Sequence, residues 1–140
     1  MENLRFLSED QVRRLQAEFG TPLFVYDQAS LERQAAVALG FPAPFGLTVR
    51  YAMKACPSAA VLRVLTEAGL HIDASSGWEV HRAIAAGVPA KRILLTAQQL
   101  PEDLAELIGL GTGFNACSLA QLVAFGRACP GQEVSVRLNP

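Results

Sequence analysis

The sequence predicts an α/β fold with a parallel sheet, either part of a (β/α)8 barrel or a five-stranded doubly wound sheet. Strand-like apolar runs begin near Thr48, His71, Arg92, Gly113 and Val134, so the step between them is 23 residues once and then 21 residues. Between these runs lie segments with apolar residues at three- and four-residue spacing, which is typical of helices. Because the strands are short and non-alternating and helices separate them, we expect both faces of the sheet to be covered.

The two architectures differ in how much of the sheet the chain would contain. A doubly wound sheet of five strands would be complete in itself, whereas an eight-stranded barrel would be a little over half present. The near-constant step favours the barrel. The chain stops at Asn139-Pro140, just after the fifth strand-like run. We therefore expect a partial, TIM-like (β/α)8 barrel, truncated after about five strands.

Helix signals agree with this repeat. Four helices are expected over residues 59–68, 78–86, 101–108 and 119–128. Ser76 and Ser118 stand where N-caps are expected, and Gly69, Gly87 and Gly109 stand where helices should end. The apolar residues of each segment predict one face packed on the sheet.

The first 46 residues precede the repeat. Their pattern predicts, in order, a helix over 8–19 capped by Ser8, a strand over 21–26, and a helix over 28–39 capped by Asp27. We therefore divide the chain into residues 1–46, which lead into the barrel, and residues 47–140, which hold its first β/α repeats.

The composition excludes several functional classes. The 140 residues are 51% hydrophobic with a formal net charge of −1, which leaves no basic surface for nucleic acid. Polar residues interrupt every apolar stretch well before the roughly 18 residues that a membrane helix needs. The start of the chain lacks the pattern of a signal peptide, and the three cysteines form no CxxC motif. We expect a soluble, cytoplasmic protein.

Lysine is rare in this chain, since Lys54 and Lys91 are two of twelve basic residues and the others are arginines. Lys91 lies in a turn-like stretch, where a solvated lysine needs no special explanation. Lys54 follows a strand-like run with Ala52, Met53 and Ala55 around it, at the edge where both architectures place catalysis. Apolar neighbours favour the neutral amine, which can react with an aldehyde cofactor or a carbonyl substrate. The alternative is a strand-end lysine whose stem extends to water.

Two further charged residues fall near the same edge. Asp73 ends the second strand-like run, where a carboxylate could orient the amine or accept a proton. Its structural alternative is a cap or a partner for Arg50. Arg137 lies in the apolar fifth run, where a guanidinium needs an anionic partner from a ligand or a carboxylate.

Other signals favour structural interpretations. Residues 109–113 look like a phosphate loop but precede a strand, so helix termination is the better interpretation. Residues 75–77 join a strand to a helix, and there N-capping is favoured over anion binding. His71 and His81 have no paired ligands around them, so no metal site is expected. Cys117 is interpreted as a small buried residue rather than a nucleophile.

With the lysine motif in place, the chain resembles the fold-type III pyridoxal-phosphate-dependent decarboxylases, among them the diaminopimelate decarboxylases. Four segments match in family order: Thr21-Pro-Leu-Phe-Val-Tyr-Asp27, Tyr51-Ala-Met-Lys-Ala55, Asp73 with Ser76-Gly77-Trp-Glu79, and Arg137-Leu-Asn-Pro140. Together they extend over roughly residues 20–140, and their order and spacing make the resemblance specific.

The resemblance implies a pyridoxal-phosphate-binding barrel of the alanine racemase type, followed by a β-rich C-terminal domain, and a homodimer in the full-length protein. It implies that Lys54 is the catalytic lysine that binds pyridoxal 5'-phosphate covalently, and that Asp73 and Arg137 lie beside the cofactor. The implied reaction is decarboxylation of a basic or diamino amino acid, foremost meso-diaminopimelate to L-lysine in lysine biosynthesis. The residues 1–140 would then be inactive alone.

Two departures from the family leave the substrate open. The family usually has asparagine at the position of Cys56, and Thr96–Leu100 replaces a segment that often carries Gly and Lys. Ornithine, lysine, arginine or carboxynorspermidine are therefore alternative substrates. Two alternatives of other classes remain, a non-catalytic pyridoxal-phosphate-binding barrel and a doubly wound domain with no cofactor.

Overall fold

The computed structural model describes residues 6–138, which form one parallel sheet with helices around it. The strands are β1 (Arg50–Ala52), β2 (His71–Ala74), β3 (Ile93–Leu95), β4 (Gly113–Ala116) and β5 (Ser135–Val136). The helices are α1 (Glu9–Phe19), α2 (Gln28–Leu39), α3 (Ala59–Glu67), α4 (Gly77–Ala85), α5 (Leu104–Gly109) and α6 (Leu119–Ala128). Two 3-10 turns, η1 (Met53–Ala55) and η2 (Ala90–Arg92), complete the described elements. The predicted α/β class is confirmed.

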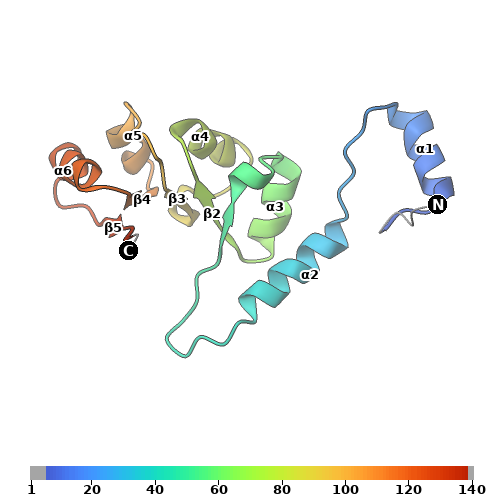
Figure 1. The fold of residues 1–140 in the computed structure, drawn as a ribbon, viewed down its shortest axis with the longest axis horizontal. Coiled ribbons are helices and arrows are strands. Elements are labelled where there is room, and N and C mark those ends of the chain that lie inside the picture. The colour runs from blue at the N-terminus through green and yellow to red at the C-terminus, as the bar shows by residue number, and fades with distance from the viewer. Residues whose placement is uncertain (1–5, 139–140) are drawn as a thin grey trace.

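The strands pair in chain order, β1-β2-β3-β4-β5, and each neighbouring pair is parallel. A doubly wound sheet would place its first strand inside the sheet and helices on both faces. Here α3 to α6 all cover the same face, as the helices around a barrel do (Figure 1). Within the described residues the sheet stays open, with β1 and β5 at its edges. The expected partial barrel of about five strands is confirmed.

Side chains along the strands alternate between the helix-covered face and an open face. On β2, Ile72 and Ala74 are fully buried beneath the helices, whereas His71 and Asp73 are half-buried on the other side. The expectation that both faces are covered is therefore wrong for the described residues. In a closed barrel this uncovered face would line the interior.

Side chains cap the helices at the predicted positions. The Ser8 hydroxyl accepts the Gln11 N–H at 3.3 Å, and the Gln11 side chain accepts the Ser8 N–H at 2.8 Å, which completes a capping box. Ser76 and Ser118 cap α4 and α6 in the same way, each accepting an N–H from three residues ahead at 3.2 Å. These caps fix where each helix begins after its strand.

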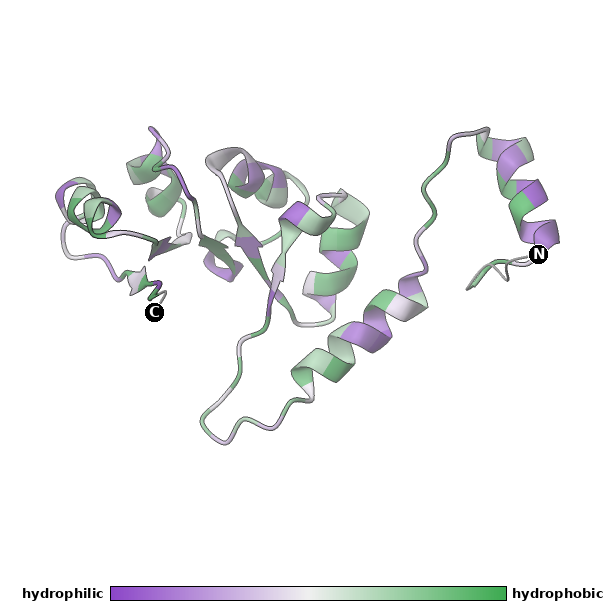
Figure 2. Cartoon of the chain, viewed as in Figure 1, coloured by the Kyte–Doolittle hydropathy of each residue, from purple (hydrophilic) through white to green (hydrophobic). Residues whose placement is uncertain are grey.

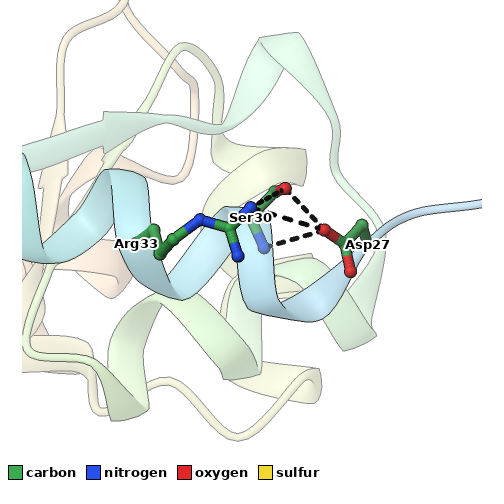
Figure 3. Close-up of polar contacts among 3 residues, drawn as sticks. All are labelled: Asp27, Ser30 and Arg33. Carbon is green, nitrogen blue, oxygen red and sulfur yellow. Dashed lines mark hydrogen bonds and ion pairs between the residues drawn. The ribbon is translucent and has the colours of Figure 1, made fainter. Parts of the chain in front are cut away.

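The start of α2 has a three-residue polar cluster (Figure 3). Asp27 Oδ2 accepts the Ser30 N–H at 3.1 Å and the Ser30 hydroxyl at 2.5 Å, and an Arg33 nitrogen lies 3.8 Å away. The Ser30 hydroxyl, chiefly, holds the pKa of Asp27 below its ordinary value. Beyond this cap, α2 packs on α3, where Ala35 is buried against Val61 and Leu65.

The segment before α2 lies apart from the sheet. No residue of α1 is buried, and the helix has one polar and one apolar side (Figures 1 and 2). The predicted strand over residues 21–26 is wrong, because this stretch is extended but pairs with no strand in the described residues. Its apolar, β-prone residues predict extended backbone, but a strand also needs a hydrogen-bonding partner. The division at residue 46 stays a prediction.

Candidate functional site at the carboxyl edge of the sheet

Lys54 lies directly after β1, in the turn η1, at the carboxyl edge of the sheet. Its neighbour Met53 is fully buried in the core, and η1 contacts β2. Lys54 itself is exposed, so the apolar enclosure expected from its neighbours is absent in the described residues. Lys91, in η2, precedes β3 and lies at the opposite edge. The two lysines therefore lie at opposite edges of the sheet.

Asp73 lies on β2, next to β1, and is level with Ala52 in the register. Asp73 Oδ1 accepts a 2.6 Å hydrogen bond from the hydroxyl of Thr96, the residue that follows β3. The suggested structural partner, Arg50, instead lies level with His71, toward the amino edge of the sheet. The carboxylate is thus held by a neutral donor.

The hydrogen bonds continue across the open face. The Asn115 side-chain amide lies 3.5 Å from the Thr96 hydroxyl, and the Ser135 hydroxyl donates to Asn115 Oδ1 at 3.1 Å. We call Asp73, Thr96, Asn115 and Ser135 the polar row, because each comes from a different strand or its end. Sequence reasoning missed the last three. The signal that could have found them is a polar side chain within or just after each successive apolar strand-like run.

Arg137 follows β5 at the far side of this edge. Its backbone N–H donates to the Ala116 carbonyl at 2.9 Å, which extends the β4–β5 ladder, while its side chain is exposed. A pocket of about 230 Å³ beside it is lined by Gln98, Cys117, Ser118, Gln121 and Arg137. Among residues 6–138 the Arg137 guanidinium forms no ion pair, so its expected anionic partner is not found there. The matching motif's Asn139 and Pro140 lie outside the described residues.

The weaker signals have structural explanations. α5 ends at Gly109, and Gly111 then adopts a left-handed φ of 96°, so residues 109–113 terminate a helix as expected. The Ser76 hydroxyl is taken by the Glu79 N–H, which confirms N-capping there. Cys117 is half-buried, with its backbone N–H bonded to the Gln121 side chain at 2.8 Å.

Cys56 lies two residues after Lys54 and contacts the N-terminal segment. Its thiol lies 3.3 Å from the Tyr26 hydroxyl, and its carbonyl accepts a 3.4 Å hydrogen bond from Tyr51. The contact with Cys56 raises the pKa of Tyr26, whereas burial chiefly raises the pKa of Tyr51. Both phenols therefore stay neutral around this turn at physiological pH.

The edge thus presents an amine on β1's turn, a carboxylate on β2 and a guanidinium after β5. This donor set fits a cofactor that carries both an aldehyde and anionic oxygens, because a lysine amine can bind the aldehyde covalently. Among the described residues no group of three His, Cys, Asp or Glu side chains is placed to hold a metal ion. That part of the chain also contains no helix long and apolar enough to cross a membrane.

Comparison with known proteins gives one consistent result. Residues 29–140 match the family model described as "Pyridoxal-dependent decarboxylase, pyridoxal binding domain". The chain is 40% identical over 129 residues to the diaminopimelate decarboxylase of Streptomyces coelicolor and 35% identical over 139 residues to that of Escherichia coli. These alignments cover 89% and 96% of this chain, but 28% and 32% of the two relatives.

A solved structure gives the same result for the fold. The lysine/ornithine decarboxylase of Vibrio vulnificus, crystallised with putrescine, superimposes with a TM-score of 0.78 at 28% identity. That superposition covers 94% of this chain and 37% of the other. The chain therefore spans about a third of the length of these relatives.

Proposed function

We propose that this chain, which belongs to the pyridoxal-dependent decarboxylase family, holds the cofactor of an enzyme that converts meso-diaminopimelate to L-lysine. Its cofactor is pyridoxal 5'-phosphate. The diaminopimelate decarboxylases at 35–40% identity support this substrate and a place in lysine biosynthesis. The observation that carries the proposal is the placement of Lys54, Asp73 and Arg137 along one edge of a barrel-type sheet.

The roles of the three residues follow from their chemistry. The Lys54 amine is the group that would hold the cofactor covalently, and its exposed position leaves it accessible to an aldehyde. Asp73 would present a carboxylate to a cationic nitrogen, since opposite charges a few ångströms apart stabilise each other. The Arg137 guanidinium would bind an anionic oxygen. When bound, pyridoxal phosphate supplies the electron sink for the electrons left as CO2 departs.

We further propose a homodimer and a cytoplasmic location for the full-length protein. The family resemblance supports the dimer. The three cysteines form no CxxC motif and cannot all pair, which fits a reducing compartment. The proposed partner is a small-molecule amino-acid substrate, with no nucleic acid and no membrane.

Decarboxylation of lysine or ornithine is the second candidate. The superposition on a lysine/ornithine decarboxylase supports it, as do the departures at Cys56 and Thr96–Leu100. Both departures lie at the carboxyl edge of the sheet, the edge that also carries the proposed lysine. The proposed reaction class is the same, and the amino acid differs.

The experiment is to trap the cofactor on the full-length protein. Borohydride reduction after loading with pyridoxal phosphate, followed by peptide mapping, should place the pyridoxyl group on Lys54. Lys54→Arg should abolish the label, because a guanidinium is too weak a nucleophile, whereas Lys91→Arg, on the opposite edge, is the matched control. A label on Lys91 or on no residue would contradict the assignment.

Release of CO2 then separates the candidate functions. The loaded protein is offered diaminopimelate, lysine and ornithine in turn, and the product amines are identified. Turnover of diaminopimelate in preference to the others supports the first proposal, and the reverse preference supports the second. A protein labelled on Lys54 that releases no CO2 from any of them would be a non-catalytic cofactor-binding barrel.

A further inference from the structure

We propose that Thr96 is a positioning residue whose hydroxyl fixes the Asp73 carboxylate in the orientation that faces the bound cofactor. The inference rests on the proposed function, because that function places Asp73 beside pyridoxal phosphate. Thr96 does not itself contact the reacting atoms in this proposal and acts through Asp73.

The contact between the two residues is short and well supported. The Thr96 Oγ1 to Asp73 Oδ1 distance is 2.6 Å, in the range of hydrogen bonds from a hydroxyl to an ionised carboxylate. The backbone beneath it is also fixed, because the Thr96 N–H donates to the Ala74 carbonyl at 2.8 Å. Threonine is β-branched, so its χ1 angle is restricted. Thr96, the donor, is therefore fixed by its backbone to β2, the strand that carries Asp73.

The neighbouring residues of the polar row favour the Thr96 hydroxyl as a donor to Asp73. A hydroxyl has one proton, and an amide N–H that points at its oxygen can only donate to it. Asn115 Nδ2 approaches the Thr96 oxygen at 3.5 Å, and the Ser135 hydroxyl lies 3.1 Å from both Asn115 Oδ1 and the Phe114 carbonyl. The Asn115 amide can therefore donate to the Thr96 oxygen but cannot accept its proton. This leaves the Asp73 carboxylate as the acceptor of the Thr96 proton.

Three variants of the full-length protein test this role. Thr96→Val keeps the branched shape but removes the hydroxyl, and Thr96→Ser restores the hydroxyl without the methyl group. Thr112→Val is the matched control: Thr112 is 5% exposed, and its hydroxyl donates to the Leu107 carbonyl at 2.7 Å. Because Thr112 precedes β4, it lies at the edge opposite to Lys54. The control thus removes a threonine hydroxyl at the edge of the sheet away from the proposed cofactor site.

Two properties other than turnover are measured for each protein, and both report on bound pyridoxal phosphate. The first is the dissociation constant of the cofactor, which Thr96→Val should raise about tenfold, the loss expected for one hydrogen bond to a charged group. The second is the pH midpoint of the visible absorbance of the bound cofactor. Thr96→Val should lower this midpoint, because a fixed carboxylate favours a protonated nitrogen beside it. Thr96→Ser should restore both values, and Thr112→Val should lower the melting temperature without changing either.

A double-mutant cycle shows whether Thr96 acts through Asp73. In an Asp73→Ala background, Thr96→Val should have no further effect on the dissociation constant or the midpoint. Additive effects, or equal effects of Thr96→Val and Thr112→Val, would overturn the inference. If Asp73→Ala alone changes neither readout, the proposed place of Asp73 fails. If Asp73→Ala changes both and Thr96→Val changes neither, the function stands and the positioning role fails.

Discussion

The rings of Phe114 and Phe125 stack with their centroids 5.2 Å apart and their planes at 5° to each other. Phe114 belongs to β4 and Phe125 to α6, the helix that follows it, and both are almost completely buried. The pair attaches α6 to the helix-covered face of the sheet. Because α6 begins where β4 ends, this contact also fixes the loop that carries Cys117 and Ser118.

Phe125→Ala should therefore cost the fold about 3–5 kcal/mol, because it removes a buried ring and leaves a cavity. Urea unfolding of the full-length protein measures the loss. Leu119→Ala on the same helix is the control, since Leu119 is 80% exposed and its truncation should change stability by less than about 0.5 kcal/mol. Equal losses in the two variants would contradict this account of the core.

Arg137→Ala should separate binding from stability. The Arg137 side chain is exposed and forms no ion pair within the described residues, so its loss should leave the melting temperature nearly unchanged. The affinity for pyridoxal phosphate should fall, because the guanidinium is proposed to bind an anionic oxygen. Arg127→Ala, another exposed arginine, is the control and should change neither quantity. A large drop in melting temperature with unchanged affinity would assign Arg137 a structural role.

His71 should make the fold less stable in mild acid. Burial, with smaller effects from Arg50 and Arg92, lowers the pKa of His71 below its ordinary 6.5. As pH falls through 6.5, the unfolded chain takes up a proton that the folded chain resists, so the free energy of unfolding decreases. His71→Leu should flatten this decrease between about pH 8 and pH 5, measured by urea unfolding. His81→Gln is the control: it keeps His71, so the decrease in the free energy of unfolding should remain. An unchanged pH dependence of that free energy in His71→Leu would refute the assignment.

Asp27 should stabilise the start of α2 at neutral pH and lose this effect in strong acid. Since its folded pKa lies below the ordinary 3.8, its contribution is complete above 3.8 and disappears as pH falls through the lowered value. An NMR titration of the Asp27 carboxyl carbon measures the midpoint. Ser30→Ala removes the hydroxyl that chiefly lowers this pKa, so the midpoint should rise toward 3.8. A wild-type midpoint at or above 3.8 would contradict the capping geometry.

What the sequence predicted well is local in the chain. Ser76, Ser118 and Asp27 were predicted as caps because a cap and the N–H it accepts are three residues apart. The strands and helices of the repeat followed from apolar spacing for the same reason. Lys54 was found because one lysine stood at the end of one strand.

What the sequence could not predict depends on contacts across the sheet. Thr96 and Asp73 are 23 residues apart, and only the register of β2 and β3 brings the hydroxyl to the carboxylate. The stretch 21–26 fails for the converse reason, because its residues favour extended backbone while its pairing depends on a partner elsewhere. The same limit explains why Arg50 was offered as the partner of Asp73.

The chain-order pairing of the strands also bears on how the protein is made. Paired residues of neighbouring strands are 19 to 21 positions apart, so each new strand needs only the segment synthesised just before it. Closing such short loops costs little entropy, and nearby contacts form quickly. At roughly 5–20 residues per second, the ribosome synthesises one strand and one helix every few seconds. Each new strand can then pair with the exposed edge of the strand synthesised before it. The strands of the barrel can therefore pair one after another during translation, and the strand that precedes Lys54 is the first of them.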